Sequence, residues 1–300
     1  MTADGAAADQ AAADQAAADQ VAADQVAADQ VAADQVAADT GELAGRTALV
    51  TGAGNGLGRA IAVALGKAGA RVILTGRTVA TLEETAALLP DADRARVVPA
   101  DVSGAASVAA LRDTLSAGAG RAEEVDLLVN NAGIGGPVKE ITDIDPPEWD
   151  EVFGANVRSV YLMCRAFLPA MYQRGSGDVI NIASVTGKRP LTRRTPYAAS
   201  KMAVLGLTRT LAFEAGPRGV RVNSLSPGPC RGQRMTRNFT REAAATGTTY
   251  EQAADAFVSR AALHRLVEED EVAAAALAML RMPGLCGADI DLSAGMIAPA

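Results

Sequence analysis

Residues 47–68 read TALVTGAGNGLGRAIAVALGKA, and this stretch decides the fold of the chain. Its first five residues are apolar or β-branched, as in a buried strand, and the residues from Arg59 onward have the composition and spacing of a helix. The glycine-rich turn Thr51–Gly58 lies between them. Glycines permit a tight turn and a close approach of the backbone to a diphosphate, which the N–H groups and dipole of the following helix then attract. The stretch therefore predicts a dinucleotide-binding βα unit.

The rest of the chain repeats this alternation of short apolar runs and alanine-rich helical segments. Alternation of this kind indicates βαβ units and a parallel sheet, and continuous apolar runs such as DLLV suit strands covered on both faces. We expect an α/β, doubly wound (Rossmann) sheet of about seven parallel strands with helices on both faces. The predicted strands are Thr47–Thr51, Arg71–Leu74, Ala95–Pro99, Leu127–Val129, Val179–Ile182, Val220–Leu225 and Asp289–Leu292. The predicted helices are Arg59–Ala68, Val79–Leu89, Ser107–Leu115, Trp149–Gln173, Ala198–Ala215 and Glu271–Leu280.

The end of the second predicted strand bears on which dinucleotide binds. Selection of NAD commonly uses a carboxylate here, which accepts a hydrogen bond from the ribose 2′-hydroxyl. This chain has Gly76 at that position, and Arg77 follows it. Because a guanidinium is shaped to bind a 2′-phosphate, the sequence favours NADP, with NAD as the alternative.

A second informative stretch, SVTGKRPLTRRTPYAASK, runs from Ser184 to Lys201. Tyr197 and Lys201 are four residues apart, so on a helix they share a face and can reach one small volume. A cation beside a phenol favours the phenolate, which brings a tyrosine nearer to acid–base chemistry at neutral pH. On these residues alone, a helix start with a solvated lysine is the alternative.

Further motifs stand in a recognisable order along the chain. They are TGAGNGLG, Asp101-Val102, Asn130-Asn-Ala-Gly133, Asn156, Ser184, YAASK and Pro227-Gly228. With them, the chain resembles the short-chain dehydrogenase/reductase family from about Leu43 to Ile297. The glycines follow the TGxxxGxG pattern of its single-domain alcohol dehydrogenases and ketoreductases, such as the 3-oxoacyl-carrier-protein reductases. The family's epimerases and dehydratases usually show TGxxGxxG, where this chain has Asn55.

The resemblance implies roles for four catalytic residues in the interconversion of a ketone and a secondary alcohol. Tyr197 would be the general acid/base, and Lys201 would lower its pKa and hold the nicotinamide ribose. Ser184 would hydrogen-bond the substrate oxygen, and Asn156 would position a water that links Lys201 to solvent. The hydride itself would belong to the cofactor.

The resemblance also implies a set of cofactor-binding residues. They are Gly52, Asn55, Gly56, Leu57, Gly58, Arg77, Asp101, Val102, Asn131, Ala132, Gly133, Tyr197, Lys201, Pro227, Gly228 and Cys230. Asp101 would bind the adenine amino group, Val102 would pack beside the adenine ring, and the NNAG motif would line the cleft. One departure occurs after Pro227-Gly228, because Gly232 stands where the family often has a threonine that contacts the nicotinamide carboxamide.

The first forty residues differ from the rest of the chain. From Ala6 to Asp39 they repeat a five-residue unit, AAADQ and then VAADQ, and they contain eight aspartates and no lysine or arginine. Successive units advance about 140° around a helix, so no apolar stripe forms. We expect residues 1–40 to be a disordered acidic tail, either a neutral repeat expansion or an interaction or solubilising segment. Residues 41–300, with 28 basic and 27 acidic groups, are expected to form a single domain.

Composition excludes several other classes of protein. Three scattered cysteines do not make a disulfide framework or a zinc site, and a single histidine leaves no Ser-His-Asp triad and no metal cluster, so we expect no metal. The sequence shows no signal peptide and no apolar run of membrane-spanning length, so we expect a cytoplasmic protein that does not bind membranes. A nearly neutral body without a basic patch interleaved with aromatics argues against nucleic-acid binding.

Residues 229–267 are expected to form a lid over the substrate. Eight cations flank the predicted cleft, and the four in the lid recur at steps of three and four residues, which would bring them broadly onto one side of a helix. The eight are Lys188, Arg189, Arg193, Arg194, Arg231, Arg234, Arg237 and Arg241. They could steer an anionic or carrier-linked substrate, or they could form a solvated face and cofactor phosphate contacts.

Two functions other than a ketone/alcohol oxidoreductase remain. One is an NADP-binding sensor or regulatory protein without catalysis, and the other is an epimerase or dehydratase that uses transient oxidation. The complete Ser-Tyr-Lys set argues against the sensor. The resemblance also implies a homodimer or homotetramer, in which the helices predicted at Trp149–Gln173 and Ala198–Ala215 pair between subunits.

Overall fold

The computed structural model describes residues 41–117 and 124–297, with the side chains of Gln233, Arg234 and Ala245 outside the description. The expected acidic tail, residues 1–40, lies outside the described residues. Within them, no helix is long and apolar enough to cross a membrane.

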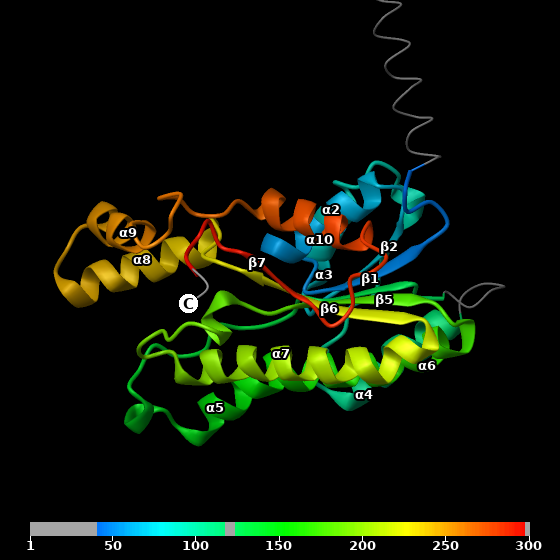
Figure 1. The fold of residues 1–300 in the computed structure, drawn as a ribbon, viewed down its shortest axis with the longest axis horizontal. Helices are drawn as coiled ribbons and strands as arrows, with labels where there is room; N and C mark the ends of the chain where they lie inside the picture. Colours follow the sequence, from blue (N-terminus) through cyan, green and yellow to red (C-terminus); the bar gives the residue numbers. More distant parts are fainter. Residues whose placement is uncertain (1–40, 118–123, 298–300) are drawn as a thin grey trace, which may run out of the picture.

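The centre of the molecule is one sheet of seven strands in the order β3-β2-β1-β4-β5-β6-β7, and every neighbouring pair is parallel (Figure 1). The strands are β1 (Thr47–Thr51), β2 (Arg71–Thr75), β3 (Ala95–Val97), β4 (Leu127–Asn130), β5 (Gly177–Ile182), β6 (Val220–Pro227) and β7 (Asp289–Leu292). The strand order reverses between β1 and β4. In open α/β sheets, ligands bind beyond the carboxyl ends of the strands at such a switch point.

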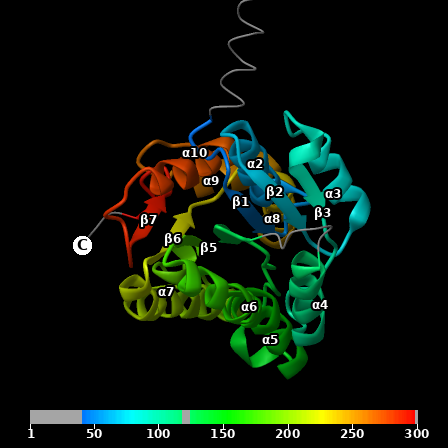
Figure 2. The ribbon, with the colours of Figure 1, turned by 90° about the vertical axis from the view of Figure 1, so that its right-hand side faces the viewer.

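Helices cover both faces of this sheet (Figure 2). On one face lie α2 (Gly56–Lys67), α3 (Val79–Ala86) and α10 (Glu269–Leu280), with α2 and α10 packed against each other. On the other face lie α4 (Ala105–Ser116), α5 (Pro146–Phe153), α6 (Ser159–Arg174) and α7 (Thr195–Ala215). The predicted doubly wound α/β fold is therefore confirmed.

Successive side chains along the strands point alternately into two hydrophobic cores, one on each face of the sheet. In β1, Leu49 faces the core beneath α4, α6 and α7, whereas its neighbour Val50 faces the core beneath α2 and α10. Ile73 and Leu74 of β2 divide between the two cores in the same way. Successive strand residues point to opposite faces, so a strand buried on both sides must be apolar at nearly every position. This requirement explains why apolar runs located the strands in the sequence.

All seven predicted strands are present, and their ends differ from the prediction by at most two residues. The helices differ more. The first begins at Gly56, inside the glycine turn, and the long helix predicted at Trp149–Gln173 consists of α5, a π-helical segment over Gly154–Arg158 and then α6. A π segment inserts one extra residue into a turn and occurs frequently at functional sites.

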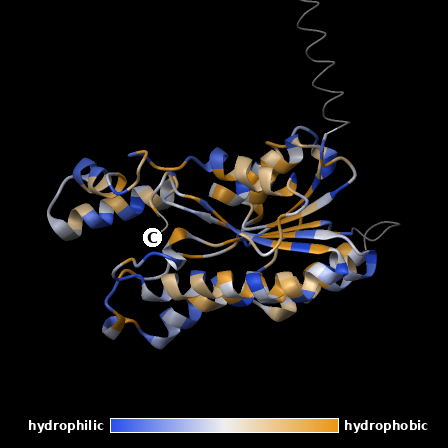
Figure 3. Cartoon of the chain, in the orientation of Figure 1, coloured by the Kyte–Doolittle hydropathy of each residue, from blue (hydrophilic) through white to orange (hydrophobic). Residues whose placement is uncertain are grey.

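Two helices that the sequence did not predict lie in the expected lid, α8 (Gln233–Thr246) and α9 (Tyr250–Val258). They stand to one side of the sheet and its covering helices (Figure 1) and carry many hydrophilic residues, in contrast to the strands (Figure 3). A small cluster of Met235, Phe239 and Leu266 holds them together, and the Phe239 ring packs edge-on against Tyr250. Residues 229–267, the expected lid, therefore have a small hydrophobic core of their own.

Candidate active site

The glycine turn between β1 and α2 is built by close backbone approach. A Cβ added at Gly58 would lie 2.2 Å from the carbonyl oxygen of Gly52, so only glycine fits there. Gly52 itself has a φ of +65°, and an added Cβ would come within 3.0 Å of the Ala132 Cα. The turn is therefore pressed against the segment that follows β4.

The start of α2 fits a diphosphate. Asn55 is the exposed N-cap residue and makes no side-chain cap hydrogen bond, and the first turn of the helix holds no acidic residue. Within 4 Å, a Cβ added at Gly56 would meet only the carboxylate of Glu269, at 3.5 Å, and the next residue, Leu57, is half-buried. The N–H groups and the positive dipole end of the helix are therefore accessible, because the residue beside them is glycine. N–H groups of this kind are the hydrogen-bond donors that a diphosphate requires.

Asn131 ties the two walls of this cleft together. Its side-chain amide donates to the carbonyl oxygens of Thr51, at 2.9 Å, and Gly52, at 3.3 Å. The backbone N–H groups of Asn131 and Ala132 both donate to the Thr51 hydroxyl at 2.9 Å. The Asn131 side chain, predicted to bind cofactor, is therefore engaged in holding the β1 and β4 loops in register.

The residues predicted to receive the adenosine follow β2 and β3. Gly76 lies next to the glycine turn, since an added Cβ would be 4.0 Å from the Gly52 Cα, and Arg77 is exposed. The hydroxyl and backbone N–H of Ser103 hold the pKa of the Asp101 carboxyl below its usual value, and the Arg77 guanidinium acts in the same direction. Val102 is buried beside Asp101. A guanidinium and an ionised carboxylate therefore flank this end of the cleft.

The tyrosine and lysine of YAASK lie on one face of α7. The Lys201 ammonium is 5.9 Å from the centroid of the Tyr197 ring, and Lys201 is buried although Tyr197 is only half-buried. Lys201 Nζ donates to the carbonyl oxygen of Ile182, at the end of β5, at 2.7 Å. The sheet therefore fixes the ammonium beside the phenol ring.

Asn156 sits in the π segment and points inward. Its side-chain oxygen accepts from the N–H of Ile134 at 2.7 Å, and its amide donates to the Ile134 carbonyl at 3.0 Å and to Ser200 Oγ at 2.9 Å. A Cβ added at Gly133 would lie 2.7 Å from Asn156 Oδ1 and 3.8 Å from Lys201 Nζ. Gly133, Asn156 and Lys201 therefore lie close together. The side-chain oxygen and nitrogen of Asn156 are hydrogen-bonded to other residues of the protein.

Ser184 follows β5 and caps the short 3₁₀ turn Val185–Gly187, where its hydroxyl accepts from the N–H of Thr186 at 3.2 Å. A Cβ added at Gly187 would lie 2.9 Å from the backbone carbonyl carbon of Lys201. Glycine there lets the Ser184 segment pack directly on α7, beside the lysine.

The segment after β6 leads into the expected lid. Pro227 is buried and ends β6, and a Cβ added at Gly228 would lie 2.7 Å from the Ser293 Cα. Cys230 is half-buried, pairs with Val267 as an isolated parallel bridge, and donates its thiol to the Gly228 carbonyl oxygen at 3.4 Å. Backbone pairing therefore fixes this segment next to the cleft.

The four cations between Ser184 and Tyr197 do not act as one group. Lys188 binds Asp289, at 2.5 Å, and Asp291; burial alone would lower the pKa of Lys188, but the two carboxylates outweigh it and raise that pKa. Arg189 donates to a backbone carbonyl at 3.4 Å, and Arg193 donates to another at 3.3 Å. Arg194 is buried against the Tyr197 ring. Lys188 therefore stabilises the position of β7 through its two ion pairs.

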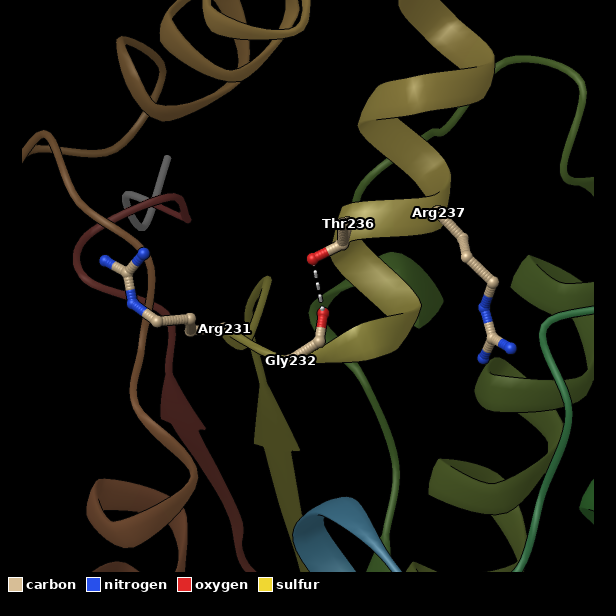
Figure 4. A pocket seen from close by; sticks show the side chains of 4 residues that line it. All are labelled: Arg231, Gly232, Thr236 and Arg237. Carbon is tan, nitrogen blue, oxygen red and sulfur yellow. Dashed lines mark hydrogen bonds between the residues drawn. The ribbon is translucent and has the colours of Figure 1, made fainter.

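Of the arginines in the expected lid, Arg231 lies outside the helix on which they were expected, whereas Arg237 and Arg241 lie four residues apart on α8 and so share a face. Arg231 lies before α8 and pairs with Glu268 at 2.9 Å, and Figure 4 shows Arg231 and Arg237 pointing to opposite sides of a pocket of about 460 Å³. Gly232 and Thr236 complete its lining, joined by a hydrogen bond of 3.3 Å. Arg237 and Arg241 are exposed, and the side chain of Arg234 lies outside the description.

Sequence reasoning missed two features of the site. It did not single out Ser200, which Asn156 contacts and whose hydroxyl donates to the Tyr197 carbonyl oxygen at 2.8 Å. It also counted Arg194 only as one cation among eight. The sequence offered no clear signal for it, because the helix was predicted to begin only at Ala198 and Arg194 is the N-cap residue of α7.

The site combines two features: a helix that begins in a glycine turn where the strand order reverses, and a buried lysine beside a tyrosine. Together they define the class of the protein as a dinucleotide-binding oxidoreductase. The family model for short chain dehydrogenase matches residues 46–244, so the chain belongs to the short-chain dehydrogenase family. D-threitol dehydrogenase of Mycolicibacterium smegmatis is 40% identical over 188 residues, which are 62% of this chain and 70% of the relative.

Solved structures agree with this assignment. An actinorhodin polyketide ketoreductase solved with NADPH superimposes with a TM-score of 0.78 and 30% identity, covering 84% of this chain and 97% of that one. Xylitol dehydrogenase bound to NAD⁺ gives a TM-score of 0.78 and 25% identity, covering 85% and 100%. The chain is therefore an NAD(P)-dependent oxidoreductase that interconverts a carbonyl and an alcohol.

Proposed function

We propose that this enzyme prefers NADP and that Tyr197 is its general acid/base. The observation that carries the proposal is the buried Lys201 ammonium, 5.9 Å from the Tyr197 ring centroid and fixed by the Ile182 carbonyl. An ammonium in this position stabilises the phenolate relative to the phenol. When bound, the nicotinamide supplies or accepts the hydride.

The other residues act around this pair. During reduction Tyr197 gives its proton to the carbonyl oxygen, and during oxidation it takes the proton of the alcohol. Ser184 donates a hydrogen bond to the same substrate oxygen, and the Asn156 side chain holds the Ile134 backbone against α7. Gly52, Asn55, Gly56, Leu57 and Gly58 hold the diphosphate.

The NADP preference rests on the end of β2. Gly76 supplies no carboxylate for a ribose 2′-hydroxyl, and the exposed Arg77 guanidinium is the group there that can bind a 2′-phosphate. Asp101 and Val102 receive the adenine, and Gly133, Pro227, Gly228 and Cys230 line the nicotinamide end.

We also propose a cytoplasmic homodimer or homotetramer. Tyr161 on α6 and Met202 and Phe213 on α7 support it, because these large apolar side chains are 50%, 49% and 85% exposed in the single chain. Burying such side chains against a second copy would remove their apolar surface from water.

The substrate of the enzyme is a small ketone or secondary alcohol, and Arg237 and Arg241 in the expected lid would steer anionic substrates toward the site.

A screen of ketones with NADPH and with NADH tests the proposal. Nicotinamide absorbance at 340 nm should fall with a ketone, and kcat/KM should be higher with NADPH by at least about tenfold, the effect of one ion pair of 1.4 kcal/mol. Arg77→Ala should remove that preference without changing kcat, whereas Arg71→Ala, at the exposed start of β2, should not. A clear NADH preference in which Arg77→Ala has no effect refutes the cofactor assignment.

A further inference from the structure

Arg194 is a buried cation in contact with the proposed acid/base. Only 9% of the residue is exposed, and its guanidinium carbon lies 5.4 Å from the centroid of the Tyr197 ring. Arg194 is the N-cap residue of α7, three residues before Tyr197, and Lys201 follows Tyr197 by four residues on the helix, with its ammonium 5.9 Å from the ring centroid. Two cations therefore lie within 6 Å of the phenol ring centroid.

Gly135 forms a seat for this guanidinium. Arg194 Nη2 donates to the carbonyl oxygen of Gly135 at 2.8 Å, and a Cβ added at Gly135 would lie 2.7 Å from the same nitrogen. A larger residue at 135 would displace the guanidinium while leaving its charge in the chain. The position of Arg194 is thus set by a specific backbone shape.

The backbone before Arg194 directs the side chain inward. Arg193 has a φ of 62°, a left-handed conformation that a residue with a side chain adopts with strain. The N–H of Lys139 donates to the Arg193 carbonyl at 3.0 Å and so holds this turn, which places Arg194 at the N-cap of α7. Strain of this kind persists where the surrounding structure requires it.

The charged groups around this helix start can be assigned element by element. From α7 itself, Arg194 and Lys201 face the Tyr197 ring. From α5, which packs against α7, come Glu148, engaged by Lys139 at 2.7 Å, and the exposed Asp150 and Glu151. The π segment, which also packs against α7, brings the buried Asn156 and the exposed Arg158, and the turn after β5, Val185–Gly187, consists of uncharged residues. Both cations in contact with the phenol ring are therefore buried.

We propose that Arg194 is a positioning residue for Tyr197. Its guanidinium holds the phenol ring and, together with Lys201, favours the phenolate. In the oxidation direction the alcohol O–H bond breaks, its proton forms the phenol O–H of Tyr197, and the hydride leaves the carbinol carbon for the bound cofactor; reduction reverses each transfer. This inference rests on the proposed function, in which Tyr197 is the acid/base.

Three variants test the proposal against a matched control. Arg194→Gln removes the charge, Arg194→Lys restores it, and Gly135→Ala displaces it; Arg112→Gln makes the same change of charge on the exposed face of α4. The measurement is kcat/KM against pH for oxidation of a neutral secondary alcohol and of a hydroxycarboxylate, both taken from the substrate screen.

In Arg194→Gln the midpoint of the pH profile should rise by about one unit for both alcohols, because an opposite charge at this range shifts a titration by 1–3 units. At neutral pH, kcat/KM should fall by about tenfold. Arg194→Lys should recover part of the shift, Gly135→Ala should shift the midpoint by less, and Arg112→Gln should not move it. A loss confined to the hydroxycarboxylate, with an unchanged midpoint, would make Arg194 a substrate contact and overturn the proposal.

A second readout does not depend on turnover. Ultraviolet titration of tyrosinate in the protein without cofactor, with Tyr197→Phe identifying the contribution of this ring, should show the same upward shift in Arg194→Gln. Thermal unfolding of each variant separates this effect from loss of fold. If Tyr197→Phe keeps native turnover, the proposed function fails; if the tyrosinate titration is unmoved in Arg194→Gln, the role of Arg194 fails.

Discussion

Two sets of cations border the cleft, and they differ in burial. Lys201 and Arg194 are 6% and 9% exposed and donate to backbone carbonyls, whereas Arg231 and Arg237 in the expected lid are exposed, and Arg231 pairs with the half-buried Glu268. Charges in water are screened within about 10 Å at ordinary salt, but buried ones are screened much less. The number of basic residues near a cleft therefore indicates little until their burial is known.

Replacement of Tyr197 by Phe should have the largest effect on activity and tests the buried side of the comparison. We expect kcat to fall about a thousandfold, because a positioned proton donor contributes 10²–10⁴. Because Tyr197 is also among the predicted cofactor-binding residues, cofactor affinity should be measured separately by fluorescence titration. The control is Tyr172→Phe on α6, whose ring also contacts a cation, with the Arg218 guanidinium carbon 4.5 Å from its centroid. Equal losses in the two variants would show that cation contact alone, not the place of Tyr197, matters.

Gly133→Ala should have the next largest effect. The new Cβ would lie 2.7 Å from Asn156 Oδ1, so the asparagine or the backbone must shift. We expect kcat/KM to fall by about tenfold or more, since small misplacements at a reaction centre are costly, and stability to fall by about 1–3 kcal/mol from overpacking. Gly284→Ala, where nothing lies within 4 Å of the new Cβ, should change stability by less than about 0.5 kcal/mol. A kcat/KM for Gly133→Ala equal to that of the native protein would show that the buried part of the site around Asn156 tolerates movement.

Neutralising the lid should change activity only slightly. We expect Arg231→Gln with Arg237→Gln to alter kcat/KM for a neutral ketone less than about twofold, because exposed charges are worth little. For a keto acid the loss should reach about threefold at low salt and disappear near 0.5 M NaCl, as long-range steering is screened. The same double change with a salt-independent, tenfold loss would place these arginines in direct contact with substrate.

The cysteines should report the same contrast in burial without affecting turnover. Burial raises the pKa of the Cys164 thiol to about 12, so it stays protonated at pH 8 and reagents that attack thiolates should not modify it. Cys286 is exposed and should react within minutes, and its modification should leave kcat unchanged. Mass spectrometry of labelled peptides measures both. Rapid labelling of Cys164 in the native protein would mean that the core around α6 opens.

The central strands β1, β2 and β4 were predictable because burial on both faces leaves them with nearly continuous apolar sequences, whereas the edge strand β7, DIDL, is only partly buried. The glycine turn was also predictable, since only glycine tolerates the 2.2 Å approach at Gly58. The π segment was not, because its form depends on contacts made by Asn156 with Ile134, 22 residues earlier in the chain. The lid helices escaped prediction because their apolar residues make only a small cluster of their own.

The roles of individual cations could not be predicted from the sequence. Lys188 is clamped by Asp289 and Asp291, more than 100 residues away, and no local pattern marks that pairing. Arg193 and Arg194 are adjacent residues of the same type, yet Arg193 is exposed and Arg194 is buried. A single left-handed residue decides which of the two turns inward, and backbone conformation of this kind follows from tertiary contacts.

The amide of Asn131 has a consequence for affinity. Because it joins the loops after β1 and β4 through the carbonyls of Thr51 and Gly52, the floor and one wall of the nucleotide cleft form a rigid unit before any ligand arrives. A preorganised cleft loses little conformational entropy on association, so more of the contact energy appears as binding. Movement during turnover should then be concentrated in α8 and α9, with the floor staying fixed.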